Sequence, residues 1–229
     1  MTPGLVSVIT PSRRGGEELK RCIASVQAQG YHHVEHVIVM DEGGQGYLPG
    51  TRQGFAVDVR YLELNDLWRT PTTTRSTGAY PWLIGTQFAR GEYITFLGDD
   101  DEMLPRHCEA HVEAMQETGA DYSLSKVDFY VDGEYALTIG DGRVAITHLD
   151  SDSIACRRET LRVANWQANG GNSPDFEMAL RWHNAGLKGC FVDEVTCRHN
   201  DGWLSTPEMR PILEAARRQE DWRKLMVVG

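Results

Sequence analysis

Three consecutive aspartates, Asp99, Asp100 and Asp101, have the residue type and spacing that most directly suggest chemistry in this chain. Like charges this close repel one another and raise each other's pKa unless a cation compensates them. Carboxylate oxygens suit Mg²⁺ and Mn²⁺, which often bridge to substrate phosphates. The same residues also suit a helix N-terminus, where the helix dipole favours negative charge. These residues alone therefore fit a metal site and a helix cap equally well.

A second candidate is Asp175, which follows a Gly/Asn-rich loop at 169–173 and a proline that can begin a helix. We expect the helix N-terminus to favour the ionised carboxylate, as a general base requires. By position alone, a helix-terminal charge without chemistry is the better interpretation.

The elements that must position these residues alternate between strand and helix in the first half of the chain. Apolar runs predict strands at 5–9, 34–40, 57–64 and 93–97, and helical spacing predicts helices at 17–29, at 81–89 and from about Pro105. This alternation predicts a parallel sheet covered by helices. Ligands bind beyond the carboxyl ends of such strands. Polar residues stand at three of these ends: Thr10-Pro11-Ser12, Asp41-Glu42 and Asp99-Asp100-Asp101.

The second half of the chain has a different pattern. Runs at 122–131, 135–139 and 143–148 are β-like, and Asp-Gly pairs at 132–133 and 141–142 predict hairpins between them. Helices are expected near 157–164 and at 174–184, a strand at 189–198, and a C-terminal helix at about 206–226.

Composition excludes several classes of protein. The chain has 229 residues, of which 41% are hydrophobic and 24% charged, as is typical of a globular protein. Its net charge of −10 argues against general binding to nucleic acid. The five cysteines are never spaced C-x-x-C, which predicts reduced thiols. We find no apolar run of about 20 residues and no signal peptide, and we expect a cytoplasmic protein.

The order of the motifs resembles the family-2 glycosyltransferases of the GT-A fold over residues 5 to about 200. The segments that carry the resemblance are Val6–Pro11, Val39–Gly43, Ala89–Asp101, Pro174–Glu177 with Arg181, and Arg198–His199. The closest match is the Gly-Glu-Tyr-Ile strand that leads into the Asp-x-Asp motif. Two positions depart from the family pattern: Trp82-Leu83 replaces a frequent Arg-Asn pair, and Glu42 replaces an aspartate.

The resemblance implies an α/β fold of the GT-A (Rossmann-like) type. A mostly parallel central sheet would be flanked by helices, with a smaller acceptor-side β/α half. A single domain would cover residues 1–229. Its parts would be a nucleotide-sugar-binding half at 1–118, an acceptor-binding half at 119–204 and a C-terminal helix at 205–229.

The implied activity is inverting, metal-dependent transfer of a sugar from a nucleotide-sugar, with a UDP-sugar favoured, to an acceptor hydroxyl. Asp175 would be the general base, and Mn²⁺ or Mg²⁺ would be held by Asp99, Asp101 and His199. Trp166 and Glu177 are the acceptor-side candidates. The nucleotide-sugar-binding candidates are Thr10, Pro11, Ser12, Asp41, Glu42, Arg75, Asp99 and Asp100.

Two alternatives stay open. A nucleotidyltransferase-like enzyme would use a phosphate loop, of which Ser12-Arg13-Arg14-Gly15-Gly16 is a faint version. A non-catalytic nucleotide-sugar-binding module is the other alternative, and the presence of both Asp101 and Asp175 argues against it. The acceptor is also open: a glycan, a lipid-linked sugar, a small molecule or a modified DNA base.

Overall fold

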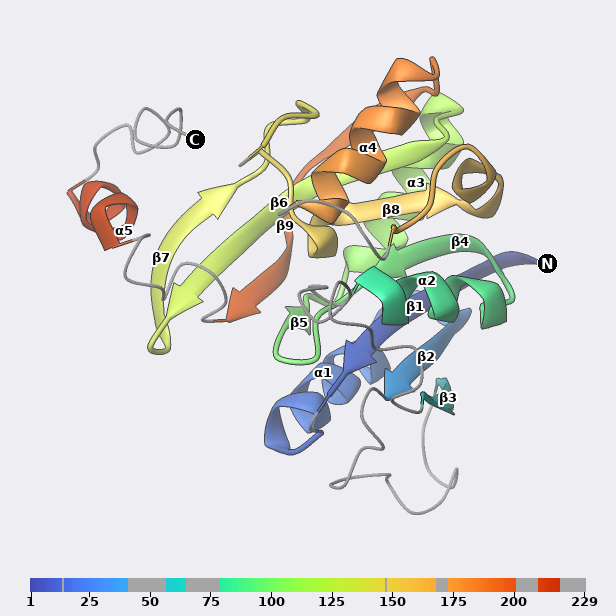
Figure 1. The fold of residues 1–229 in the computed structure, drawn as a ribbon, viewed down its shortest axis with the longest axis horizontal. Coiled ribbons are helices and arrows are strands. Elements are labelled where there is room, and N and C mark those ends of the chain that lie inside the picture. The colour runs from blue at the N-terminus through green and yellow to red at the C-terminus, as the bar shows by residue number, and fades with distance from the viewer. Residues whose placement is uncertain are drawn as a thin grey trace.

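A computed structural model describes residues 1–13, 15–40, 57–64, 79–146, 148–167, 173–200 and 210–218 (Figure 1). The predicted site residues Asp41, Glu42 and Arg75 lie outside these ranges. The strands are β1 (Thr2–Ser12), β2 (Val34–Met40), β3 (Asp58–Glu63), β4 (Gly91–Phe96), β5 (Glu102–Met103), β6 (Tyr122–Val131), β7 (Glu134–Ile139), β8 (Ile154–Arg157) and β9 (Gly189–Asn200). The helices are α1 (Glu17–Gln27), α2 (Ala79–Phe88), α3 (His107–Thr118), α4 (Pro174–Asn184) and α5 (Arg210–Arg217), with 3₁₀ turns η2 (Ser151–Ser153) and η3 (Arg158–Arg162).

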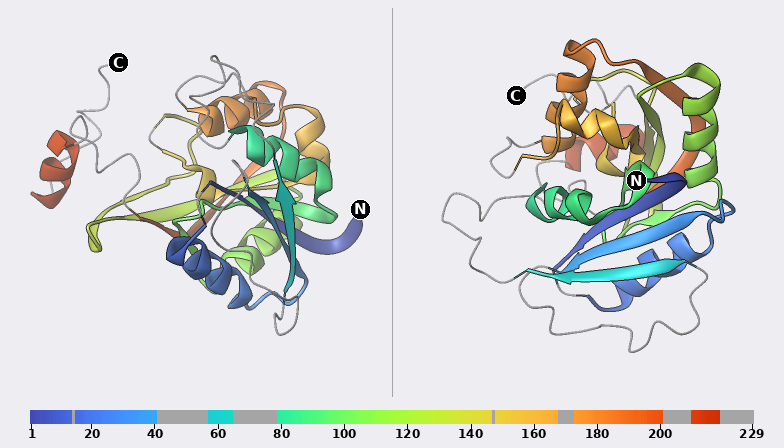
Figure 2. Two further views of the ribbon diagram at one scale, coloured as in Figure 1. Left: turned by 60° about the horizontal axis from the view of Figure 1, so that its bottom comes forward. Right: turned by 90° about the vertical axis from the view of Figure 1, so that its right-hand side faces the viewer.

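The first half of the chain forms the parallel part of the sheet, in the order β3-β2-β1-β4. β1 and β2 are nearly continuous apolar runs because helices cover both faces of the sheet. α1 and α3 pack on one face and α2 and α4 on the other (Figure 2). α2 lies very close to β1, because a Cβ at Gly85 would overlap the Ile9 side chain. The predicted α/β fold class is therefore confirmed.

The second half extends the same sheet with strands of mixed direction. β8 runs antiparallel between β4 and β6, β9 runs parallel to β6, and the short β5 pairs antiparallel with β9. The turn after β4 and the end of β9 are consequently neighbours although they are far apart in sequence. One sheet runs through both predicted halves, and the boundary at residue 118 stays a prediction.

One of the two predicted hairpins forms. Asp132 and Gly133 have φ of 53° and 78°, the left-handed pair that a tight turn between β6 and β7 requires. The second prediction is wrong, since none of the described residues of 143–148 belongs to a strand. Instead Asp141 accepts hydrogen bonds from the backbone and guanidinium of Arg143, and its carboxylate also lies 3.0 Å from His148. These contacts fold the segment back on itself.

Two further element predictions need correction. The helix expected at 157–164 is the 3₁₀ turn η3, and the strand β8 just before it was not expected. Ile154, Ala155 and Cys156 are all buried, so this short apolar run fills a central strand position. The C-terminal helix covers Arg210–Arg217 within the described residues and packs against β7 (Figure 1).

Candidate active site

The carboxyl ends of β1 and β4 meet as the sequence predicts. The hydroxyl of Ser12 donates to Asp99 Oδ2 at 2.6 Å, which joins the two strand ends directly. Pro11 beside it is partly exposed. Thr10 behaves differently, because its side chain is fully buried and its Oγ1 lies 2.8 Å from His36 Nε2. The Thr10 hydroxyl therefore packs inside the sheet and does not face a ligand.

Of the three aspartates of the β4–β5 turn, Asp99 and Asp100 are partly buried and Asp101 is buried. Burial raises the pKa of Asp99, and burial together with the charge of Asp99 raises the pKa of Asp100 to about 6. Asp101 is the most buried, and burial and the charge of Asp152 hold its pKa well above the usual range. The backbone N–H of Asn200 donates to Asp101 Oδ1 at 2.7 Å and fixes this carboxylate. The turn therefore carries excess negative charge that a cation would relieve.

His199, at the end of β9, faces this turn. Its Nδ1 lies 3.4 Å from Asp101 Oδ2, 3.5 Å from Asp150 Oδ1 and 3.6 Å from Asp152 Oδ2. Phe129 of the neighbouring strand stacks on the imidazole, with ring centroids 4.5 Å apart. Burial disfavours the protonated imidazole, but Asp101 and Asp150 outweigh it and hold the pKa of His199 well above its usual range. The expected proximity of Asp101 and His199 is thus present in the structure.

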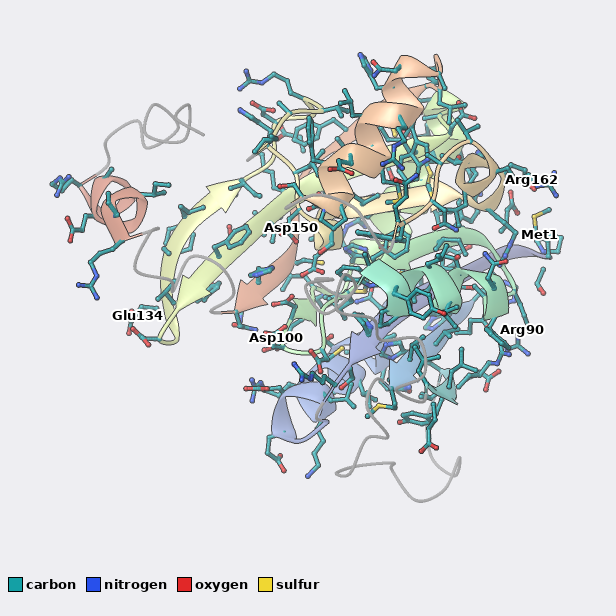
Figure 3. All side chains as sticks on the ribbon, viewed as in Figure 1. Met1, Arg90, Asp100, Glu134, Asp150 and Arg162 are labelled. Atoms are coloured by element: carbon teal, nitrogen blue, oxygen red, sulfur yellow. The ribbon has the colours of Figure 1, made fainter. Side chains whose placement is uncertain are left out.

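Asp150 and Asp152 belong to this site, and sequence reasoning missed both. They lie at η2, where Asp150 caps the turn by accepting from the backbone N–H of Asp152. Asp150 lies near the middle of the molecule, as does Asp100, whereas Glu134 lies at the hairpin tip and Arg90 at the opposite side (Figure 3). A sequence signal is present: two aspartates two positions apart stand one residue before an apolar run, as Asp99 and Asp101 begin one residue after one.

The residues fit a divalent cation. One ligand atom each from Asp101, Asp152 and His199 lies within 4.8 Å of the other two, a spacing that suits ligands around one ion. Asp152 Oδ2 and His199 Nδ1 are buried atoms without a hydrogen-bond partner, although buried polar atoms usually have one. Asp99, predicted as a ligand, instead contacts Ser12 and is outside this group.

Asp175 occupies the first turn of α4, where its Oδ1 accepts from the N–H of Phe176. The helix N-terminus by itself favours the ionised form. Burial has the opposite effect and, with the negative charge of Asp150, raises the pKa of Asp175 to about 7. The negative charges of Asp150 and Asp152 both act in this direction on the pKa of Asp175. A carboxyl group with this pKa suits proton transfer near neutral pH.

The two acceptor-side candidates have different surroundings. Glu177, one turn before Arg181 on α4, lies 3.2 Å from its guanidinium and is partly buried. Trp166 is only 1% exposed and stacks on Trp82 with ring centroids 4.3 Å apart. Its indole is therefore part of the core between β4 and the helices, and it presents no surface to an acceptor.

The sheet carries an acidic turn after β4 and a histidine at the end of β9. Comparison with solved structures shows that this architecture is the GT-A fold. TarS of S. aureus, solved in complex with UDP, matches with a TM-score of 0.65 at 15% identity, over 93% of this chain and 64% of its own. The mannosyltransferase PcManGT from Pyrobaculum calidifontis, solved in complex with GDP-Man and Mn²⁺, matches with a TM-score of 0.61 at 15% identity, over 98% and 64%.

Sequence comparison then gives the family. The sequence model of the family Glycosyl transferase family 2 matches residues 7–168, so the chain belongs to this family. Glycosyltransferase GlyG of Streptococcus pneumoniae serotype 4 is 26% identical over 140 residues, which cover 57% of this chain and 44% of the relative. The chain thus spans less than half the length of that relative. The family is one of glycosyltransferases, in agreement with the predicted enzyme class.

None of the helices within the described residues is both long and apolar enough to cross a bilayer.

Proposed function

We propose that this glycosyltransferase transfers a sugar from a nucleotide-sugar, with UDP-sugars favoured, to an acceptor hydroxyl with inversion at the anomeric carbon. The observation that carries the proposal is the meeting of Asp101, Asp152 and His199. The general-base candidate Asp175 has its pKa raised in part by the charges of Asp150 and Asp152. The proposal is supported by TarS, solved with UDP and with UDP-GlcNAc, and by PcManGT, solved with GDP-Man and Mn²⁺.

The strand ends are assigned to the donor. Ser12 and Asp99 are joined by a hydrogen bond next to Pro11, and Asp100 continues the same turn. In open α/β sheets a nucleotide binds at such carboxyl ends. Asp41, Glu42 and Arg75 are proposed as further donor contacts and lie outside the described residues.

Asp101 and His199 are assigned to a divalent cation, Mn²⁺ or Mg²⁺. When bound, the cation supplies positive charge that stabilises the diphosphate as its bond to the sugar breaks. Asp101 is pre-positioned by its hydrogen bond from Asn200, and the ring of His199 is held against Phe129. Both ligands therefore have fixed orientations before any donor arrives.

Asp175 is assigned the proton transfer. Its carboxylate takes the proton of the acceptor hydroxyl while the acceptor oxygen bonds to the anomeric carbon and the diphosphate leaves from the opposite face. Attack and departure on opposite faces invert the anomeric centre. Glu177, two positions along α4, is proposed to contact the acceptor, and the chemical identity of that acceptor stays open among the classes given above.

The experiment is a panel of UDP-, GDP- and TDP-sugars with Mn²⁺, in which slow hydrolysis without acceptor is measured for each donor. We expect one UDP-sugar to be consumed, activity to disappear with EDTA, and Asp101→Asn to lose at least about 100-fold. Asp193→Asn, an exposed carboxylate of β9 that pairs with Lys126, is the control for net charge. Full activity in EDTA would refute the metal assignment, and preference for another nucleotide would refute the UDP assignment.

A further inference from the structure

One carboxylate oxygen of Asp152 accepts a hydrogen bond and the other does not. Its Oδ1 accepts from the backbone N–H of Gly98 at 3.0 Å. Its Oδ2 has no hydrogen-bond partner, although the side chain is fully buried. That oxygen lies 3.6 Å from Nδ1 of His199, which has no hydrogen-bond partner either. Leaving a buried carboxylate oxygen without a hydrogen bond is costly, and a cation between this oxygen and the imidazole nitrogen would give both atoms a partner.

Asp101 repeats this arrangement with a different backbone donor. Its Oδ1 accepts from the N–H of Asn200, and its Oδ2 lies 3.4 Å from His199 Nδ1. Both aspartates are therefore anchored by a backbone N–H through one oxygen, while the other oxygen lies beside the same imidazole nitrogen. Such anchoring is how proteins orient metal ligands before the ion arrives.

Asp150 has a different part in the cluster. Its Oδ1 accepts from the N–H of Asp152 at 3.0 Å and lies 3.4 Å from the Ser151 hydroxyl. Because these contacts occupy Oδ1, Asp150 shapes the turn that carries Asp152 and adds negative charge near His199. The cluster then holds three carboxylates around a single imidazole, an imbalance that one divalent cation offsets.

We propose that Asp152 is a third protein ligand and that Asp101, Asp152 and His199 bind one Mn²⁺ before any nucleotide-sugar is present. Mg²⁺ sites usually rely on one or two carboxylates plus substrate phosphates. Three buried, oriented ligands remove that dependence. Mg²⁺ and Ca²⁺ prefer ligand sets made of oxygen alone, so a set that includes an imidazole suits the transition-metal ion Mn²⁺ better. The inference rests on the proposed function only where the bound ion is given a role in sugar transfer.

The test is a titration of the nucleotide-free protein with Mn²⁺, in which the electron paramagnetic resonance signal of free Mn²⁺ measures how much ion remains unbound. We expect one ion per chain, and Asp152→Asn to weaken binding at least about tenfold. Asparagine keeps an oxygen for the Gly98 N–H, so the turn should survive, and circular dichroism verifies the fold. Asp193→Asn, with the same change in charge at an exposed position, should bind as the wild type does.

A second measurement keeps the test decisive if Asp152→Asn fails to fold. Electron spin echo spectra of Mn²⁺ bound to the wild type should show coupling to a histidine nitrogen, and Asp152→Glu should bind Mn²⁺ more weakly while keeping the charge. Wild-type protein that binds Mn²⁺ only when UDP is added would overturn the inference and leave the proposed function intact. If the nucleotide-free protein binds Mn²⁺ but consumes no nucleotide-sugar, the inference stands and the proposed function is refuted.

Discussion

Replacing Asp175 with Asn tests the general-base assignment most directly. Asparagine keeps the size of the side chain and an oxygen for the N–H of Phe176, but it cannot take a proton from an acceptor. General-base catalysis contributes roughly 10²–10⁴-fold, so kcat should fall within that range while donor affinity stays near the wild-type value. Burial and the charge of Asp150 raise the pKa of Asp175, so the rate should also depend on pH.

The base must be ionised, so activity rises with pH as Asp175 loses its proton. With a pKa of about 7, the carboxylate fraction falls about tenfold between pH 8 and pH 6. In metal-free protein, ¹³C NMR of the Asp175 carboxyl should show this titration near pH 7. A bound cation favours the carboxylate, so the acid limb of kcat should lie at or below pH 7 in the Mn²⁺-loaded enzyme.

The assay is kcat against pH at saturating donor, acceptor and Mn²⁺, with added viscogen to establish that chemistry limits the rate. Wild type should show the acid limb, and Asp175→Asn should lack it. Glu177→Gln is the comparison, since it removes the other carboxylate of the first turn of α4. A limb that persists in Asp175→Asn and disappears in Glu177→Gln would move the base to Glu177. Turnover of Asp175→Asn within a few-fold of wild type would refute the reasoning.

Two further substitutions probe the surroundings of the site. Gly98→Ala would place a Cβ against Asp101 Oδ2, so Mn²⁺ affinity should fall at least about tenfold, and unchanged affinity would contradict the ligand geometry. Glu35 is a buried carboxylate whose pKa is lowered, because hydrogen bonds from Ser7 and Arg90 outweigh burial. Glu35→Gln should therefore cost roughly 1.5–3 kcal/mol in urea unfolding at pH 7, and this difference should shrink as acid protonates Glu35 in the wild type.

The strand-and-helix alternation of the first half was predictable because each element buries a continuous or periodic apolar face. The position of Asp101 could also be predicted, since it follows a buried strand. Its partnership with His199 came from the family resemblance, not from spacing. Residues 101 and 199 meet because β5 pairs with β9, and no local pattern specifies such a long-range pairing.

The parts that sequence reasoning missed have a common cause. β8 is only four residues long, and its place between β4 and β6 is decided by tertiary packing. Without that strand, Asp150 and Asp152 had no predicted neighbours. Trp166 was misjudged for a related reason, because its flanking Gly/Asn-rich loop suggested a surface position while its ring packs in the core. The pKa of Asp175 depends on burial, which helix position alone does not reveal.

The three proposed ligands come from the turn after β4, the 3₁₀ turn before β8 and the end of β9, so a cation there would act as a cross-link between distant parts of the chain. A ligand that binds only the folded protein stabilises it by about 2.7 kcal/mol at a hundred times its dissociation constant. The melting temperature should consequently follow the free Mn²⁺ concentration. Chelator added during purification would then lower the stability of the whole sheet as well as empty the site.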